Sequence, residues 1–399
     1  MAALLLELGL LLVTLATAGW VGRRLGQSVI PFYVLGGMAM SPFVLGRVGP
    51  PQLAAYAIAD QPYLTLLAEV GIVLLLFFLG LEFSLERLLA ARRRIATAGA
   101  IDLVVNLPLG VAVGLALGWG LLEALVLGGV VYISSSAVIT KSLIDLGWIA
   151  NDEAAPLLGT LVFKDLVIAV YLAVLSAVLL GGGSAVAVAG DLAVAVGFLA
   201  LLVAAVWLCA GLFERLLRTA TAEQFVLRAV AAAVAVGGVA LSIGVSEAVA
   251  AFFVGMGFAE TSHLAELEGQ LRPLRDVFAG VFFFWIGANT DPAVFPAVAG
   301  VIAVLVVLTG AAKLATGYAG GAVYGLGHRR RVRVATGMLT RGEFSLIIAA
   351  IAATAVVDSA VLTQTIPAVA VGYVLVMSIL GTLLMQHADR LARIVPAVG

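Results

Sequence analysis

Two adjacent ionisable residues, Lys164 and Asp165, lie inside an otherwise apolar run over residues 154–180. The run is long enough to cross a bilayer as a helix. Asp165 is about 11 residues into the run, or about 16 Å along a helix axis, and so close to the bilayer midplane. Because a charge at that depth is costly and marks a functional site by default, Asp165 is the first candidate for a functional residue.

Further polar side chains are expected at a similar depth in other apolar runs. They are Ser134, Ser135, Ser136, Lys313, Arg341 and Glu343. A carboxylate in such a place can bind either a proton or a small cation, so the two compete for one site. Serine hydroxyls and the free carbonyls of a broken helix would add neutral oxygen ligands that suit Na⁺ or K⁺. The structural alternatives are that the serines bond back to their own helix and that the acids and bases only pair with one another.

The elements that carry these residues must be membrane-spanning helices. The chain has 399 residues, of which 63% are hydrophobic and only 11% are charged, and its mean hydropathy is +1.17. A soluble protein of this length could not bury so much apolar surface, so lipid is its solvent. The net charge of −1 gives no sign of nucleic-acid binding. One cysteine and three scattered histidines offer neither a disulfide framework nor a metal cluster, and we expect no cofactor.

About 13 apolar runs qualify as spans. They cover residues 2–21, 29–45, 63–83, 95–118, 121–146, 154–180, 187–213, 225–245, 246–260, 275–288, 295–325, 332–357 and 362–386. The connections after odd-numbered runs are rich in arginine, except the one after the fifth, whereas the connections after even-numbered runs hold only Arg47. The positive-inside rule predicts a multi-pass protein of the cell (inner) membrane, with its N-terminus outside and its C-terminus in the cytoplasm.

The layout of these runs indicates two related halves. We predict a first inverted repeat over residues 1–186, a linker helix over 187–222 and a second inverted repeat over 223–399. The corresponding fifth and twelfth runs are interrupted at 134–136 and 340–343. The fourth run carries Asp102 and Asn106, read as polar lining without an assigned role, and its partner carries Lys313. The expected fold class is an all-α polytopic membrane protein with two inverted six-helix repeats.

Six motifs follow one another along most of the chain: EVGIVLLLFFLGLE at 69–82, SSSAV at 134–138, FKD at 163–165, VSEAVAAFFVG at 245–255, RPLRDVF at 272–278 and TRGEF at 340–344. With them the chain resembles the second family of monovalent cation–proton antiporters, which includes sodium–proton antiporters and the glutathione-gated potassium efflux transporters. The resemblance implies a homodimer with one panel of helices at its interface. It also implies a six-helix core with two crossed discontinuous helices, which moves as an elevator.

By that resemblance Asp165 is the carboxylate that binds cation or proton, and Lys313 is the lysine of the helix that faces it. The predicted site consists of Asp165, Ser134, Ser135 and Ser136 as ligands of the monovalent cation or proton, and of Lys164, Lys313, Arg341 and Glu343 as charge partners. For Asp165 the structural alternative is a pair with one of the two lysines. For Arg341 and Glu343 it is a fixed salt bridge that stabilises the broken helix.

Lys164 departs from the pattern of that family, in which the residue before the key aspartate usually carries no positive charge. A single carboxylate suggests the exchange of one proton per cation, so we expect electroneutral transport. Lys164 could turn toward Glu343 or another acid as a structural tie, lose its proton on burial, or inactivate transport. The sequence leaves these alternatives open.

Two other functions are compatible with a buried carboxylate. A ligand-gated potassium efflux pathway that behaves like a channel usually carries a C-terminal nucleotide-binding domain, and no glycine-rich fingerprint follows the last span here. A cytoplasmic regulatory subunit or domain outside this sequence stays open as a partner, and the acidic connection over 260–268 is a candidate regulatory segment. An intramembrane aspartyl protease would need a second acid, such as Asp102 or Glu343, facing Asp165. Because no second catalytic motif is present, we expect a transporter and not an enzyme.

Overall fold

The computed structural model describes residues 2–394, apart from 49–55, 59–60, 82–84, 149, 181–193, 219–220, 244–246 and several positions between 195 and 209. The described parts are helical and contain no strand. The helices are α1 (Ala2–Arg24), α2 (Ile30–Met40), α3 (Leu45–Val48), α5 (Pro62–Leu81), α6 (Leu85–Ala116), α7 (Leu121–Tyr132), α8 (Ser136–Asp145), α9 (Ala154–Leu180), α11 (Ala210–Leu217), α12 (Ala222–Ser242), α13 (Glu247–Ala259), α14 (Leu264–Ala288), α15 (Phe295–Val323), α16 (His328–Gly337), α17 (Glu343–Ala353), α18 (Ile366–Gln386) and α19 (Ala388–Ile394).

Most of the predicted runs coincide with these helices. Within the described residues, six helical segments are long and apolar enough to cross a bilayer, and four shorter apolar helices lie in the third, fifth, ninth and twelfth runs. The fifth and twelfth runs are each split into two helices, as their interruptions predicted. Much of the seventh run and half of the predicted linker fall outside the described residues. The repeat boundaries at 186 and 223 therefore remain predictions.

Three helix boundaries differ from the prediction by five residues or more, for local reasons. Helix α2 ends at Met40, because Ser41 precedes a proline and takes an extended conformation. Helices α6 and α14 begin about ten residues before the predicted spans, at Leu85 and Leu264. Their first turns are rich in charged residues, so a search for apolar runs does not find them although they are helical.

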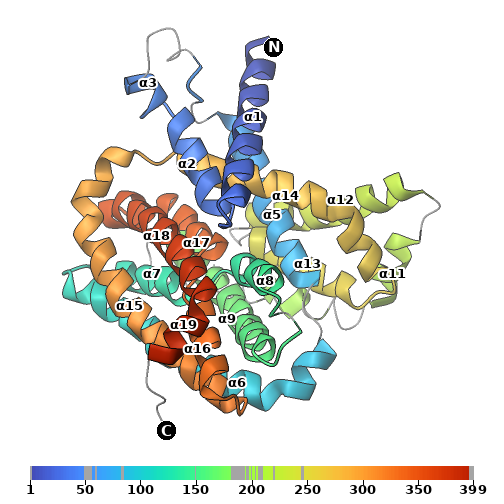
Figure 1. The fold of residues 1–399 in the computed structure, drawn as a ribbon. Coiled ribbons are helices and arrows are strands. Elements are labelled where there is room, and N and C mark those ends of the chain that lie inside the picture. Colours follow the sequence, from blue (N-terminus) through green and yellow to red (C-terminus); the bar gives the residue numbers. More distant parts are fainter. Residues whose placement is uncertain are drawn as a thin grey trace.

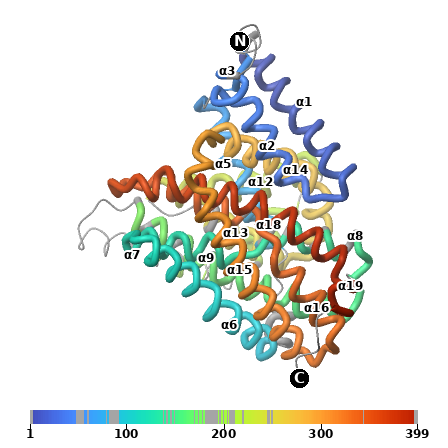
Figure 2. The backbone as a smooth tube through the Cα atoms, turned by 60° about the vertical axis from the view of Figure 1, so that its left-hand side comes forward, coloured from blue at the N-terminus to red at the C-terminus, as the bar shows by residue number. Residues whose placement is uncertain are grey.

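The helices form two groups, each built from both halves of the chain. The first group, called the panel here, contains α1, α2, α5, α12, α13 and α14. The second, called the core, contains α6 to α9 and α15 to α18. In Figure 1 the panel helices α1 and α2 lie toward the top, and the core helices α6 and α16 lie toward the bottom. Figure 2 shows α6 and α15 running side by side along the core.

Two crossings within the panel bring helix backbones into direct contact. A Cβ atom on Gly37 of α2 would collide with the carbonyl of Phe284 on α14, and one on Gly287 would collide with the carbonyl of Val34. Gly80 and Gly255 make the same reciprocal contact between α5 and α13. Small residues at such crossings let helices pack closely in lipid, where no hydrophobic effect drives them together. The panel is therefore held by close backbone packing.

The described termini lie at opposite ends of the molecule, as an odd number of spans requires (Figures 1 and 2). Both exceptions to the arginine pattern are paired with a residue of opposite charge. Arg47 lies 2.8 Å from Asp291, in another connection after an even-numbered run. The connection after the fifth run carries Asp152 and Glu153, which pair with arginines of α16. Each pair joins two connections that the arginine pattern places on the same side of the membrane, so the exceptions do not contradict that pattern.

Candidate functional site at the crossing of two broken helices

The two discontinuous helices meet at their breaks. Helix α7 ends at Tyr132 and α8 begins at Ser136, while α16 ends at Gly337 and α17 begins at Glu343. The backbone N–H of Ser135 donates to the carbonyl of Thr340 at 3.2 Å. Gly342 is required at this crossing, because a Cβ there would collide with the Ser135 side chain. The breaks leave backbone groups without helical partners inside an apolar protein, so other polar groups must satisfy them.

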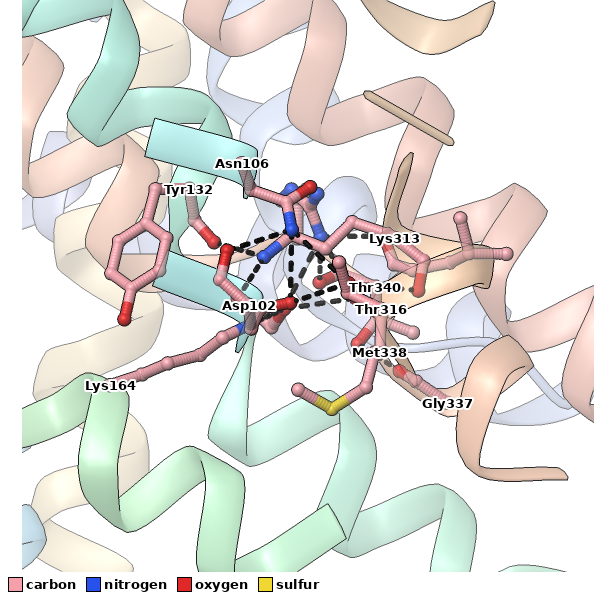
Figure 3. Close-up of polar contacts among 12 residues, drawn as sticks. Asp102, Asn106, Tyr132, Lys164, Lys313, Thr316, Gly337, Met338 and Thr340 are labelled. Atoms are coloured by element: carbon pink, nitrogen blue, oxygen red, sulfur yellow. Dashed lines mark hydrogen bonds and ion pairs between the residues drawn. The ribbon is translucent and has the colours of Figure 1, made fainter. Parts of the chain in front are cut away.

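Asp102 lies at the centre of the site and is buried (Figure 3). Its Oδ2 atom is 2.6 Å from Lys313 Nζ and 3.0 Å from Lys164 Nζ. Its Oδ1 atom accepts hydrogen bonds from Thr316 Oγ1 at 2.9 Å and from Asn106 Nδ2 at 3.1 Å. These residues come from α6, α9 and α15, so one carboxylate joins helices of both halves. A buried carboxylate with two cations and two donors is well compensated.

Both lysines also connect Asp102 to the breaks. Lys313 Nζ donates to the carbonyl of Tyr132, the last residue of α7, at 2.6 Å. An ammonium group is favourable there, because the C-terminal end of a helix carries partial negative charge. Lys164 Nζ donates to Ser134 Oγ at 2.8 Å, and that hydroxyl donates to the carbonyl of Met338 at 2.9 Å. Lys164 is thus linked to both breaks at once.

Arg341 lies within the second break and is completely buried. Its Nη1 atom donates to the carbonyls of Met338, Leu339 and Thr340 at 2.9 to 3.1 Å, and its guanidinium lies 5.6 Å from the centre of the Tyr373 ring. These contacts place a positive charge at the C-terminal end of α16, as Lys313 does at the end of α7. The predicted salt bridge between Arg341 and Glu343 remains a prediction, because the Glu343 side chain lies outside the described parts.

Asp165 is buried on α9, with 4% of its surface exposed. Asp102 forms the described ion pairs of both Lys164 and Lys313. Ser134 and Ser135 are buried at the crossing, whereas Ser136 begins α8 and is half-buried. The structure therefore brings the predicted serines, Lys164, Lys313 and Arg341 to one place.

The sequence assigned no role to Asp102 and Asn106 and did not single out Thr316, which donates to Asp102. One signal could have identified Asp102: two lysines at mid-membrane depth require at least one acid beyond Asp165. The sequence contains several acids that could meet this need, including Glu343. Only the packing of α6 between α9 and α15 selects Asp102.

The fold and this buried charge cluster define a polytopic membrane transporter. A family model described as "Sodium/hydrogen exchanger, transmembrane" matches residues 11–387. The chain belongs to this family of monovalent cation–proton antiporters, which confirms the resemblance of its motifs.

The chain is similar over nearly its whole length to two named antiporter subunits. It is 33% identical to the K(+)/H(+) antiporter subunit KhtU of Bacillus subtilis (strain 168), over 99% of this chain and 96% of that one. It is 30% identical to the Ammonium/H(+) antiporter subunit AmhT of Alkalihalophilus pseudofirmus, over 97% and 94%. The solved structure of the sodium proton antiporter MjNhaP1 from Methanocaldococcus jannaschii has the same fold, with a TM-score of 0.71, 15% identity and coverage of 98% and 99%.

Proposed function

We propose that this protein exchanges K⁺ or Na⁺ for protons by alternating access, and that Asp165 binds the cation or the proton in competition. The observation that carries this proposal is the buried charge cluster at the crossing of two broken helices. Such a crossing places carbonyl oxygens, hydroxyls and carboxylates in the interior, and these groups suit a small monovalent cation. The relatives named above transport K⁺, ammonium or Na⁺ by name, which supports a monovalent cation as the substrate.

The charges of the cluster favour exchange over simple uptake. Its described side chains include three bases, Lys164, Lys313 and Arg341, and two acids, Asp102 and Asp165, a formal sum of +1 when all are ionised. Adding a cation to this sum in a buried site is unfavourable unless a positive charge leaves. Releasing one proton for each cation keeps the sum constant. We therefore propose electroneutral exchange of one proton per cation.

Lys164 has a specific role in this scheme. Its ammonium contacts Ser134 and Asp102, which offer the hydroxyl and carboxylate oxygens that a bound cation would use. The hydroxyl of Ser134 donates to the carbonyl of Met338, and its oxygen accepts hydrogen bonds from Lys164 Nζ at 2.8 Å and from Arg341 Nη1 at 3.4 Å, which occupies both of its lone pairs. A cation that uses Ser134 as a ligand therefore has to displace the ammonium of Lys164. We propose that Lys164 competes with the cation, whereas Asp102 and Lys313 hold the crossing together.

Alternating access is assigned to a movement of the core against the panel. The close backbone contacts at Gly37 and Gly255 favour a panel that stays rigid. The core carries both breaks and all the described charges of the site, so it can move as one body. We propose that the panel forms the interface of a homodimer, with the N-terminus outside the cell and the C-terminus in the cytoplasm.

The proposed function is tested by exchange in proteoliposomes. Addition of K⁺ or Na⁺ is expected to dissipate an imposed pH gradient while a second ionophore clamps the voltage, and comparison with Rb⁺ and Li⁺ defines selectivity. Asp165→Asn is expected to abolish exchange. Asp358→Asn is the matched control, because Asp358 lies in the connection before α18. Wild-type exchange by Asp165→Asn would contradict the assigned role, and step-like currents in planar bilayers would support a channel-like pathway instead.

A further inference from the structure

A second cluster of charges joins α16, α19 and the connection before α9 at the end of the molecule where α19 lies. It consists of Asp152, Glu153, Arg329, Arg330, Arg333 and Asp389 and is called the α16 ion cluster here. Asp152 and Glu153 lie just before α9, the arginines lie on α16, and Asp389 lies on α19. Three acids and three bases balance in charge. Neither the proposed exchange site nor the antiporter chemistry uses them.

Glu153 differs from the other members of the cluster in its burial. None of its side chain is exposed, whereas 67% of Asp152 is exposed. Arg333, with 14% exposed, forms an ion pair with Glu153 Oε1. Asn151 Nδ2 donates to the same oxygen at 3.2 Å. Because a fully buried carboxylate loses its hydration, it persists only where a partner is held in a fixed geometry.

Arg333 is itself fixed on two further sides. Its Nε and Nη2 atoms donate to the two carboxylate oxygens of Asp389, each at 2.9 Å. Its guanidinium lies 4.5 Å from the centre of the Trp148 ring. A guanidinium that is bound bidentately on one side and stacked on a ring has little freedom to turn. Glu153 therefore meets a partner whose position is set by α19 and by the connection after α8.

The pair of Glu153 and Arg333 lies in line with the exchange site. Glu153 directly precedes α9, and Lys164 is 11 residues further, or about 16 Å along the helix. Arg333 is five residues before Met338, or about 8 Å along α16. Lys164 on α9 is in turn linked to Met338, the residue after α16, through the hydroxyl of Ser134. Helices α9 and α16 are thus joined at two points, with apolar packing of Leu157 and Leu161 against Val334 and Met338 between them.

We propose that Glu153 is a positioning residue: through Arg333 it holds α9 at one axial position against α16. Two joints along one helix pair determine their register, whereas one joint and an apolar interface allow sliding. Loss of the Glu153 charge would therefore shift Lys164 relative to Ser134 and the carbonyl of Met338. The consequence for transport rests on the proposed function, but the consequence for register does not.

The test compares Glu153→Gln with Asp152→Asn in the full chain. Both variants remove one carboxylate of the same cluster, and Asp152 contacts only an exposed arginine among its described partners. We expect Glu153→Gln to change the half-saturating K⁺ or Na⁺ concentration at least fivefold, with Asp152→Asn within twofold of wild type. Hydrogen exchange of the amides at 337–341 is expected to quicken in Glu153→Gln only. A role limited to stability would lower the unfolding temperature without changing the half-saturating cation concentration or the hydrogen exchange at 337–341.

Two outcomes would overturn the positioning role. One is a Glu153→Gln protein with wild-type half-saturation and wild-type hydrogen exchange at the second break. The other is a wild-type result in Arg333→Lys, the variant that is used if Glu153→Gln cannot be recovered folded. Lysine keeps the charge but cannot reproduce the bidentate contact with Asp389 and the planar stack on Trp148 that fix Arg333, so wild-type values in Arg333→Lys would overturn the role. If wild-type protein shows no cation–proton exchange, the proposed function fails, and the hydrogen-exchange comparison still decides the register.

Discussion

Replacing Lys164 by glutamine is expected to raise the apparent affinity for the transported cation. The ammonium of Lys164 lies 2.8 Å from Ser134 Oγ and 3.0 Å from Asp102 Oδ2, and in our scheme a cation competes with it for these oxygens. Glutamine removes the positive charge and approximates the length of the side chain. Asp102 keeps its ion pair with Lys313, so the fold is expected to tolerate the change.

The size of this effect follows from the contacts that the cation has to replace. A hydrogen bond that involves a charged group contributes about 1.5 to 3 kcal/mol net. To reach Ser134 the cation has to displace at least one such bond of Lys164. Since about 1.4 kcal/mol corresponds to a factor of ten, the half-saturating concentration of the cation should fall at least about tenfold in Lys164→Gln.

Proteoliposomes with an imposed pH gradient measure this quantity directly. Exchange is followed against K⁺ or Na⁺ concentration, with the membrane voltage clamped. Lys164→Arg is the control, because it keeps the positive charge and should keep a half-saturating concentration near the wild-type value. An unchanged or higher half-saturating concentration in folded Lys164→Gln protein would refute the competition between lysine and cation.

Three further predictions concern stability. Asp102→Asn leaves two buried lysines without their shared carboxylate and should lower the free energy of unfolding by about 3 to 5 kcal/mol. Denaturation in detergent measures this loss, and a smaller loss than that of Asp358→Asn would be contrary to the reasoning. Gly255→Ala should lower the free energy of unfolding by more than about 2 kcal/mol, because the new methyl group meets the backbone of α5. Gly238→Ala is the control: its methyl group meets no atom, so the change should be neutral or stabilising by up to about 1 kcal/mol. Hydrogen bonds from Arg329 and Arg333 hold the pKa of Asp389 well below its usual value, so Asp389 stabilises the fold above the pKa of the unfolded chain and less as the pH falls. The difference in unfolding temperature between wild type and Asp389→Asn should therefore be constant above about pH 5 and shrink below about pH 4, and a difference that grows on acidification would contradict this sign.

Much of the fold was predictable because lipid imposes local rules. In hydrocarbon every backbone polar group must be satisfied within its own segment, so an apolar run of sufficient length becomes a helix. The run over 154–180 accordingly coincides with α9. Serines and a glycine within apolar runs indicated the two breaks, and six motifs in order indicated the family. Each of these signals is contained in a short stretch of chain.

The partners of the buried charges were decided by the tertiary structure. Asp102 and Lys313 are 211 residues apart, and their pairing depends on how α6 is rotated against α15. The acids at 152 and 153 looked like an exception to the arginine pattern until their partners on α16 were known. A sequence states which charges must be compensated in a low-dielectric interior, but several acids can meet that need. Only the packing of helices distant in the chain determines which carboxylate lies within reach of each lysine or arginine.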